Sequence, residues 1–268
     1  MNTVRHHVDD SPRLKMSGIV KRFGATLALD GVDLYLESGQ VLALVGENGA
    51  GKSTLLKLAC GELSPSSGQV YFQGRILAEH ALSERAKNLA VLPQSSPLNF
   101  PFTSEEVVLL GRTPHSTGTR ADADIVDQAL QLVDAEHLRL QAYTQLSGGE
   151  QQRVQLARIF AQVWAMQPGR ASVLILDEPT SALDFAHQHL ILQALRQKAD
   201  DGCGVLLALH DLNLAAAFAD QVLLMDKGHL RAQGSADEIL QPPLLSDVFG
   251  LPFYRMSHPG SGKPLLVY

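Results

Sequence analysis

Short, nearly uninterrupted apolar runs punctuate the chain and are separated by polar loops and amphipathic segments. Residues 41–45, 173–176 and 205–209 are three such runs, and each is long enough for one strand. Strands without polar alternation are typical of a parallel sheet that is buried on both faces. Polar residues and then helical periodicity follow the runs. The pattern therefore predicts an α/β fold with a parallel sheet at its centre.

The pattern changes on both sides of this core. Around the first run, residues 13–93 contain further β-type segments, which predict antiparallel strands, including one over residues 71–77. Between residues 95 and 149 the periodicity is helical. The spacing Thr103-x-x-Glu106 predicts a capping box, and "ADADIVDQALQLVDA" is amphipathic. From about residue 228, the chain is predicted to add a short strand, a helix and a closing segment.

These segments predict one domain with an inserted helical region. A further long helix is expected from about Gly149 to Met166. The predicted domain covers residues 13–268, with 13–94 and 150–268 forming the core and its antiparallel β subdomain, and 95–149 forming the helical subdomain.

Composition and charge narrow the function classes. The chain has 268 residues, 45% of them hydrophobic, and a formal net charge of -6. An acidic chain is a poor candidate for non-specific nucleic-acid binding, which rests on clustered Lys and Arg. Cys60 and Cys203 lie in apolar runs and indicate buried thiols in a reducing compartment. Since no apolar leader and no run of roughly 18 apolar residues is found, we expect a soluble, cytoplasmic protein.

A phosphate-binding loop follows the first apolar run. The sequence Gly46-x4-Gly51-Lys52-Ser53 stands between a predicted strand and a predicted helix, which is the context of a P-loop. Backbone N–H groups of such a loop face the phosphates, the lysine reaches the β and γ oxygens, and the hydroxyl binds Mg²⁺. The predicted loop comprises Gly46, Glu47, Asn48, Gly49, Ala50, Gly51, Lys52, Ser53 and Thr54.

Polar residues follow three other predicted strands. Asp177 and Glu178 come after residues 173–176, where Asp177 is expected to hold Mg²⁺ and Glu178 to polarise the attacking water. Gln94 is expected to touch Mg²⁺ or this water. His210 is expected to contact the γ-phosphate. The carboxyl ends of parallel strands meet at one sheet edge, where α/β folds bind ligands.

A second anion site is predicted at "LSGGEQQR". Ser147, Gly148 and Gly149 stand at the start of a helix, whose N–H groups and dipole attract anions. The P-loop already accounts for the phosphates of one nucleotide. We therefore expect the second site to face the nucleotide of another copy, in a two-fold dimer that ATP closes and hydrolysis releases.

Together these residues resemble a known family. "GENGAGKST", Gln94, "LSGGEQQR", "LILDEP", "SALD" and His210 occur in the order found in ATP-binding-cassette ATPases, over about residues 14–267. The resemblance implies the P-loop NTPase fold of that family, with a RecA-like parallel-sheet core, an antiparallel β subdomain and a helical insertion. ATP and Mg²⁺ are the implied cofactors. Glu150 is a departure, since many members have Gln there.

The resemblance also implies roles for single residues. Phe23 falls where an aromatic side chain stacks on adenine, although a core aromatic is the alternative at this position. Ser147, Gly148 and Gly149 fall on the signature motif that contacts ATP in trans, and Asp184 on the loop that crosses the dimer. Glu178 is the implied catalytic base, with Gln94 and His210 beside it.

Partners follow from the same resemblance. The helical insertion and the Gln94 loop imply a groove for a permease helix, so we expect a homodimer bound to two membrane permease subunits and, through them, to a substrate-binding protein. The expected location is peripheral, on the cytoplasmic face of the inner membrane. Neither nucleic acid nor haem is expected to bind this chain directly.

The transported substrate rests on finer likeness. "LALHDLNLAAAFAD" is similar to ATPases of importers for ferric siderophores, vitamin B12 and haem, and "NFPFTSEEVVLLGRTPH" and "HPGSGKPLLVY" are most similar to the haem branch. Siderophore and B12 import remain alternatives. ABC ATPases that act on DNA or ribosomes form a different class, disfavoured by the short insertion without heptads and the single P-loop. A metabolic P-loop kinase would have no use for "LSGGE".

Overall fold

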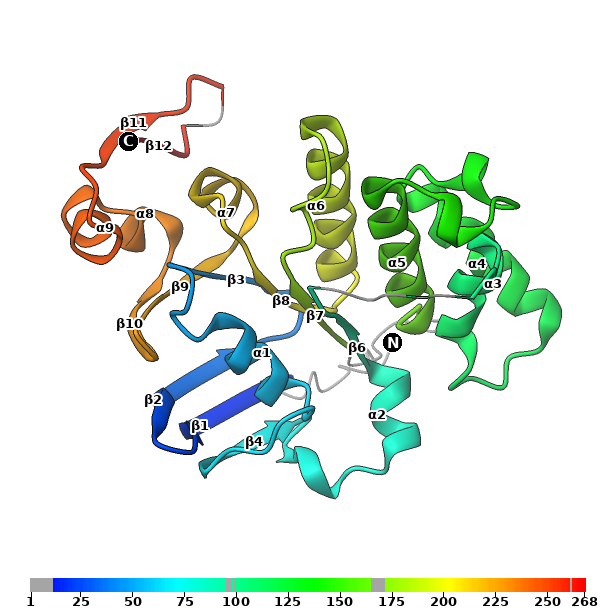
Figure 1. Ribbon diagram of the computed structural model, residues 1–268, viewed down its shortest axis with the longest axis horizontal. Helices are drawn as coiled ribbons and strands as arrows, with labels where there is room; N and C mark the ends of the chain where they lie inside the picture. Colours follow the sequence, from blue (N-terminus) through cyan, green and yellow to red (C-terminus); the bar gives the residue numbers. More distant parts are fainter. Residues whose placement is uncertain (1–11, 95–97, 99, 165–171, 261) are drawn as a thin grey trace, which may run out of the picture.

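A six-stranded sheet forms the centre of the molecule (Figure 1). The computed structural model describes residues 12–94, 98, 100–164, 172–260 and 262–268. The strand order is β10-β9-β3-β8-β7-β6. The strands are β3 (Val41–Gly46), β6 (Leu89–Leu92), β7 (Val173–Asp177), β8 (Gly204–Ala208), β9 (Gln221–Asp226) and β10 (His229–Gly234). All neighbours pair in parallel except β10, which is antiparallel to β9. The predicted α/β fold is thus confirmed.

The central strands are buried on both faces, as their uninterrupted apolar runs indicate. Every residue of β3, β7 and β8 is buried. Along β3, Val41, Ala43 and Val45 face one hydrophobic cluster, whereas Leu42 and Leu44 face the other. Helix α1 (Lys52–Ala59) contributes to the second cluster, and helices α6 (Phe185–Asp200) and α7 (Leu212–Phe218) contribute to the first. Figure 1 shows α1 on one side of the sheet and α6 and α7 on the other.

An antiparallel sheet lies beside α1, with the order β2-β1-β4-β5. Its strands are β1 (Leu14–Phe23), β2 (Thr26–Leu36), β4 (Ser67–Phe72) and β5 (Arg75–Ile76). The single strand predicted over residues 71–77 is wrong. Gln73 and Gly74 both have positive φ, 49° and 75°, and turn the chain back into a hairpin. The turn η1 (Leu77–Glu79) and helix α2 (Leu82–Asn88) then lead to β6.

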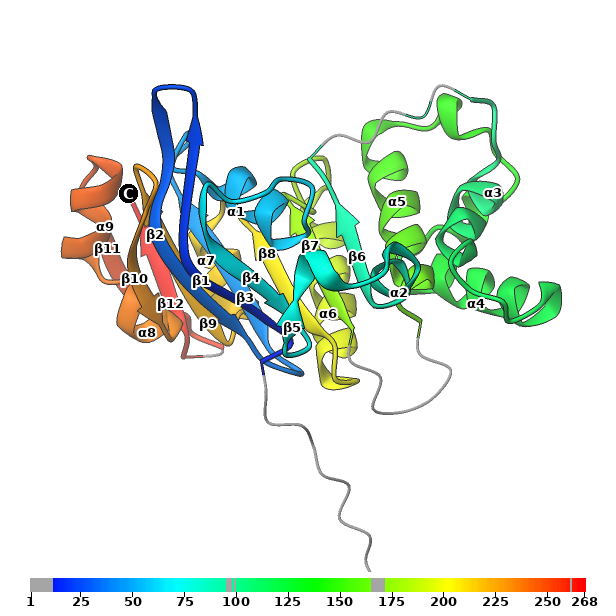
Figure 2. The same ribbon diagram turned by 90° about the horizontal axis from the view of Figure 1, so that it is seen from below.

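Residues 100–162 form a helical region that lies beyond β6, the edge strand of the central sheet (Figure 2). It comprises α3 (Ser104–Leu109), η2 (Leu110–Arg112), α4 (Thr119–Leu132), η3 (Glu136–Leu138), η4 (Tyr143–Gln145) and α5 (Gly148–Gln162). The capping box of Thr103 and Glu106 is confirmed. Helix α5 packs against α3, α4 and β6, so the helical region and the sheet share one hydrophobic cluster. The boundaries of the predicted subdomains stay a prediction.

Helix α5 is shorter than predicted. It ends at Gln162 with Val163 as its C-cap, whereas the sequence pattern suggested Met166, which lies outside the described residues. The Trp164 N–H bonds the Ala161 carbonyl, three residues back. The end of the helix therefore tightens, as helix termini often do.

The carboxyl-terminal segment closes the opposite end of the molecule. It contains α8 (Ala236–Ile239), α9 (Pro242–Phe249) and a hairpin of β11 (Tyr254–Ser257) and β12 (Pro264–Val267). Phe253 and Leu266 are buried in the main cluster. Among the described residues no helix is long and apolar enough to cross a membrane. Cys60 and Cys203 are buried thiols, as predicted, and burial raises the pKa of Cys203 to about 11.

Candidate functional site

Four adjacent parallel strands end at one edge of the central sheet, and each is followed by residues singled out in the sequence. The P-loop follows β3, His210 follows β8, Asp177 ends β7 and Glu178 follows it, and Gln94 follows β6. We call Lys52, Gln94, Asp177, Glu178 and His210 the sheet-edge cluster. The parallel order β3-β8-β7-β6 is what brings these residues together from distant parts of the chain.

The P-loop is held by its own lysine. Lys52 Nζ donates to the carbonyl oxygens of Gly46 and Glu47, at 2.7 and 2.9 Å. A Cβ atom on Gly46 would lie 2.2 Å from the Met225 carbonyl oxygen, so only glycine fits between the loop and β9. The loop tip, with Glu47, Asn48 and Gly49, is exposed. The loop is thus open to a ligand on its outer side.

Lys52 is a buried cation that forms no ion pair within the described part of the chain. It is 6% exposed, and burial lowers its pKa, while the nearby charges of Glu178 and Asp177 act in the opposite direction. A partly desolvated ammonium that bonds only carbonyl oxygens is poised to exchange them for a stronger acceptor. Phosphate oxygens are such acceptors.

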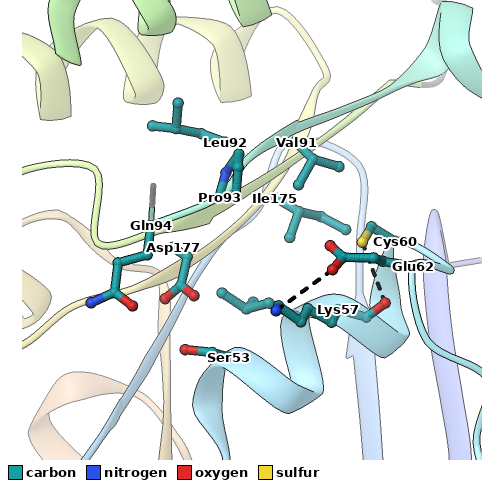
Figure 3. A pocket seen from close by; sticks show the side chains of 11 residues that line it. Ser53, Lys57, Cys60, Glu62, Val91, Leu92, Pro93, Gln94, Ile175 and Asp177 are labelled. Atoms are coloured by element: carbon teal, nitrogen blue, oxygen red, sulfur yellow. Dashed lines mark hydrogen bonds and ion pairs between the residues drawn. The ribbon is translucent and has the colours of Figure 1, made fainter. Parts of the chain in front are cut away.

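Asp177 faces a cavity beside the first turn of α1. It is 7% exposed, and among the described residues its Oδ1 atom has no hydrogen-bond partner. Burial raises its pKa, whereas the neighbouring Ser53 hydroxyl favours the ionised form. Figure 3 shows the ends of Gln94, Asp177 and Ser53 grouped at one side of this cavity, which measures about 230 Å³. These carboxylate, amide and hydroxyl oxygens form the hard-oxygen donor set that suits Mg²⁺.

Glu178 lies between two polar side chains. Its Oε1 lies 2.5 Å from His210 Nε2, and its Oε2 accepts from Gln94 Nε2 at 3.3 Å. The backbone of Glu178 has φ 55°, which costs a non-glycine residue roughly 1–2 kcal/mol. Its N–H bonds the Ala208 carbonyl at the end of β8. A carboxylate fixed in this way can accept a proton from water at the sheet edge.

Ser147, Gly148 and Gly149, which we call the signature turn, start helix α5. The Ser147 hydroxyl accepts the Glu150 N–H, and Glu150 Oε2 accepts the Ser147 N–H at 2.8 Å and its hydroxyl at 2.7 Å. These bonds lower the pKa of Glu150. Sequence analysis missed this second capping box, although the S-x-x-E spacing that revealed the one at Thr103 is present here too.

The loop before α6 packs against the signature turn. A Cβ on Gly149 would lie 2.9 Å from the Ala182 carbonyl oxygen, so this contact requires glycine. Asp184 then caps α6, with its Oδ1 accepting the His187 N–H at 2.9 Å. Bonds to His187 lower the pKa of Asp184, whose carboxylate is exposed. Asp184 therefore belongs to the surface around the signature turn rather than to the sheet-edge cluster.

Phe23 ends β1, away from the core. Its side chain is 49% exposed, and Lys21 Nζ lies 5.0 Å from the ring centroid. The alternative that Phe23 is a core aromatic is therefore wrong. An exposed ring is available for stacking on a planar ligand.

The sheet-edge cluster and the signature turn lie apart within one chain. Figures 1 and 2 both place strands β6 and β7 between α1, which follows the P-loop, and α5, which follows the signature turn. The P-loop thus lies with the other members of the sheet-edge cluster. The signature turn lies on a separate surface.

Comparisons with known proteins agree with this architecture. A family profile described as ABC transporter matches residues 29–181. The chain is 49% identical to the hemin import ATP-binding protein HmuV of Pseudomonas putida, over 95% of this chain and 99% of that protein, and 46% identical to HmuV of Gloeobacter violaceus, over 95% and 93%.

Solved structures resemble the chain over most of its length. An ABC transporter assigned to the metal-chelate type, in an inward-facing conformation, matches with a TM-score of 0.79 at 27% identity, covering 96% of this chain and 97% of that one. The dimeric, post-hydrolysis state of the ATP-binding cassette MJ0796, bound to ADP and Pi, matches with a TM-score of 0.72 at 25% identity, covering 83% and 98%.

Proposed function

The chain belongs to the ABC transporter family, and on that premise we propose that it hydrolyses ATP to power a bacterial importer of haem. The observation that carries the ATPase assignment is the convergence of Lys52, Asp177, Glu178, Gln94 and His210 at one sheet edge. The haem assignment is supported by the likeness to hemin import ATP-binding proteins over 95% of the chain.

ATP binding is assigned to the P-loop and to Phe23. Lys52 would exchange its two carbonyl acceptors for β- and γ-phosphate oxygens, because among the described residues no carboxylate lies at bonding distance from its buried charge. The exposed ring of Phe23 would stack on adenine. Residues 46–54 thus hold the phosphates, and the end of β1 holds the base.

Mg²⁺ is proposed at Asp177, Ser53 and Gln94. The unpartnered, buried Oδ1 of Asp177 supports this, since a buried carboxylate oxygen is costly to leave unpaired. When bound, the ion would neutralise charge on the phosphate oxygens. Asp177 would then regain a partner for its orphaned oxygen, and the Ser53 hydroxyl would be oriented beside it.

Glu178 is proposed as the general base. His210 and Gln94 flank its two carboxylate oxygens and would fix its direction toward an attacking water. His210 would reach the γ-phosphate from the same position. The left-handed backbone of Glu178 is consistent with this role, because such strain is common where side chains must be aimed.

A homodimer is proposed to complete each site. Strands β6 and β7 lie between α1, which follows the P-loop, and α5, which the signature turn starts, so we expect Ser147, Gly148 and Gly149 to cover the nucleotide of the partner copy. Gly149 and Asp184 lie on the same surface, which would form part of the dimer interface. ATP would then hold the two copies together until it is hydrolysed.

Two permease subunits and a substrate-binding protein are proposed as further partners, with this chain at the cytoplasmic face of the inner membrane. Closing and opening of the dimer would move the permease. Ferric-siderophore or vitamin B12 import is the alternative within the same role. An ATPase acting on DNA or ribosomes is disfavoured by the formal net charge of -6.

Growth on single iron sources tests the substrate. A strain lacking this chain is supplied with haem, a ferric siderophore or inorganic iron alone. The proposal predicts loss of growth on haem only, restored by the wild-type chain but not by Lys52→Ala. Growth on haem combined with a defect on the siderophore would contradict haem import and leave the ATPase assignment standing.

A further inference from the structure

The helix that follows His210 is tied to the carboxyl-terminal hairpin. Asn213, in the first turn of α7, donates from Nδ2 to the Leu266 carbonyl at 3.1 Å and accepts the Leu266 N–H on Oδ1 at 2.7 Å. One amide side chain thereby pairs with both backbone groups of a residue in β12. At the other end of the helix, Lys263 Nζ donates to the Ala217 carbonyl oxygen at 2.5 Å. The hairpin is thus hydrogen-bonded to both ends of α7.

On the side that faces α9 and the hairpin, packing alone does not hold the His210 side chain in place. An open cavity of about 460 Å³ lies between the start of α7, α9 and the hairpin, and His210, Leu212, Phe249 and Tyr268 line it. Protein interiors are otherwise close-packed, and packed neighbours are what usually hold a side chain in place. The His210 side chain is 46% exposed. Its position therefore depends on the backbone that carries it.

Asn213 is close enough in sequence to His210 for its bonds to Leu266 to restrain the backbone of His210. Only Asp211 and Leu212 separate it from His210, and Asp211 Oδ1 accepts the Asn213 N–H at 2.7 Å as the N-cap of α7. Leu266 is 4% exposed and belongs to the main hydrophobic cluster, which holds this part of β12 against the core. The contact of 2.5 Å between His210 Nε2 and Glu178 Oε1 is shorter than the usual N–H···O distance. A shift of the first turn of α7 would lengthen this contact and turn the imidazole away from the carboxylate.

We propose that Asn213 is a positioning residue for ATP hydrolysis, which couples the hairpin of β11 and β12 to the start of α7 and so keeps His210 beside Glu178. This inference rests on the proposed ATPase function. It gives the carboxyl-terminal hairpin a part in hydrolysis, although the hairpin contributes no residue to the sheet-edge cluster.

The main test compares Asn213→Ala with Gln233→Ala. Gln233 Nε2 donates to Gln221 Oε1 at 3.1 Å, so the control also loses one amide side chain and its bond, but between β10 and β9. Hydrolysis is measured per nucleotide-binding site, with sites counted by titration with fluorescent ADP. We expect kcat to fall on the order of tenfold in Asn213→Ala, with KM for ATP unchanged, because a misplaced group slows chemistry without weakening binding. Gln233→Ala should match wild type.

A double variant separates positioning from general destabilisation. If Asn213 acts through His210, then Asn213→Ala should cause no further loss in a His210→Gln background. Independent, additive losses in the double variant would overturn the inference, as would a wild-type kcat in Asn213→Ala. The imidazole NMR signal of His210, identified by its disappearance in His210→Gln, should shift in Asn213→Ala and stay in place in Gln233→Ala.

A truncation removes the anchor instead of the amide. A chain that ends at residue 262 lacks Leu266 and should lose kcat as Asn213→Ala does, with no added effect when the two are combined. This variant tests the inference even if Asn213→Ala folds poorly, and a truncated chain with full kcat per site would contradict it. Full hydrolysis in His210→Gln would refute the proposed role of His210. That result would contradict the proposed mechanism itself, and not only the link between Asn213 and Leu266.

Discussion

The sheet-edge cluster and the signature turn are both predicted anion sites, but their polar groups are satisfied in opposite ways. At the sheet edge, Lys52 and Asp177 are buried, and Asp177 Oδ1 has no partner among the described residues. At the signature turn, Ser147 and Glu150 satisfy each other's backbone and side-chain groups in a capping box at the surface. The sheet edge leaves a buried oxygen without a partner, whereas the capping box already satisfies Ser147 and Glu150 at the start of α5.

This difference indicates which region depends on the nucleotide for its stability. Burial shifts the pKa values of Asp177 and Lys52 toward their neutral forms, so the charges cost folding energy that a bound phosphate and cation would recover. The signature turn needs no such compensation. The turn is therefore a preformed, exposed surface that a second copy of the chain can contact.

The largest effect is expected at Glu178. Glu178→Gln keeps the shape of the side chain and removes its proton-accepting charge, so hydrolysis should fall by roughly 10²–10⁴-fold with ATP affinity retained. Phosphate release and ATP binding are measured on the same preparation, and an ATP-bound dimer should accumulate in size-exclusion chromatography. Wild-type turnover in this variant would remove Glu178 as the base.

A large loss of hydrolysis, with ATP binding retained, is also expected at the signature turn. Ser147→Arg places a bulky side chain on the exposed face of the turn, and we expect at least about a 10²-fold loss of hydrolysis, the size typical of losing an oriented donor. ATP should still bind the P-loop of the isolated chain. Asp237→Arg, a charge change at the exposed end of the molecule, serves as the control. Unimpaired hydrolysis in Ser147→Arg would separate this turn from the site.

Removing the cap alone should reduce stability. Ser147→Ala deletes the hydroxyl that accepts the Glu150 N–H, and we expect a loss of about 1 kcal/mol in the free energy of unfolding. Urea unfolding of the nucleotide-free chain measures it. Thr103→Ala removes the equivalent cap of α3 and should cost a similar amount while sparing hydrolysis.

At the sheet edge we expect a substitution to raise the free energy of unfolding rather than to lower it. Burial raises the pKa of Asp177, so the folded state holds its proton up to higher pH than the unfolded state, and this carboxyl lowers stability as pH rises through that window. Asp177→Asn removes the charge and should raise the free energy of unfolding near pH 7 by on the order of 1 kcal/mol, while Mg²⁺-dependent hydrolysis is lost. The gain should vanish in acid. A less stable variant at pH 7 would refute this account of Asp177.

Local patterns predicted the sheet edge well, because each part of it follows an apolar strand within a few residues. The P-loop, the strand of Asp177 and the position of His210 all carry short-range signals. The pairing of Glu178 with both His210 and Gln94 is a consequence of strand order, which sequence spacing alone does not fix.

The errors have equally local causes. Residues 71–77 carry strong β propensity on both sides of Gln73 and Gly74, so a hairpin resembled one strand. The end of α5 lacks a glycine or proline stop signal, so the sequence pattern predicts a longer helix than the one that forms. The bonds between Asn213 and Leu266 join residues 53 positions apart and leave no trace in a local pattern.

ATP-dependent cross-linking between chains tests most directly whether the signature turn completes the sheet edge of a partner. Asn48→Cys in one chain and Ser147→Cys in another, both in the Glu178→Gln background, are mixed with a short bifunctional maleimide. Asn48 and Ser147 are exposed, and both native cysteines are buried. A shared site predicts a cross-linked dimer of the two different chains with ATP and none with ADP. Equal cross-linking in the absence of ATP, or none with it, would contradict the shared site.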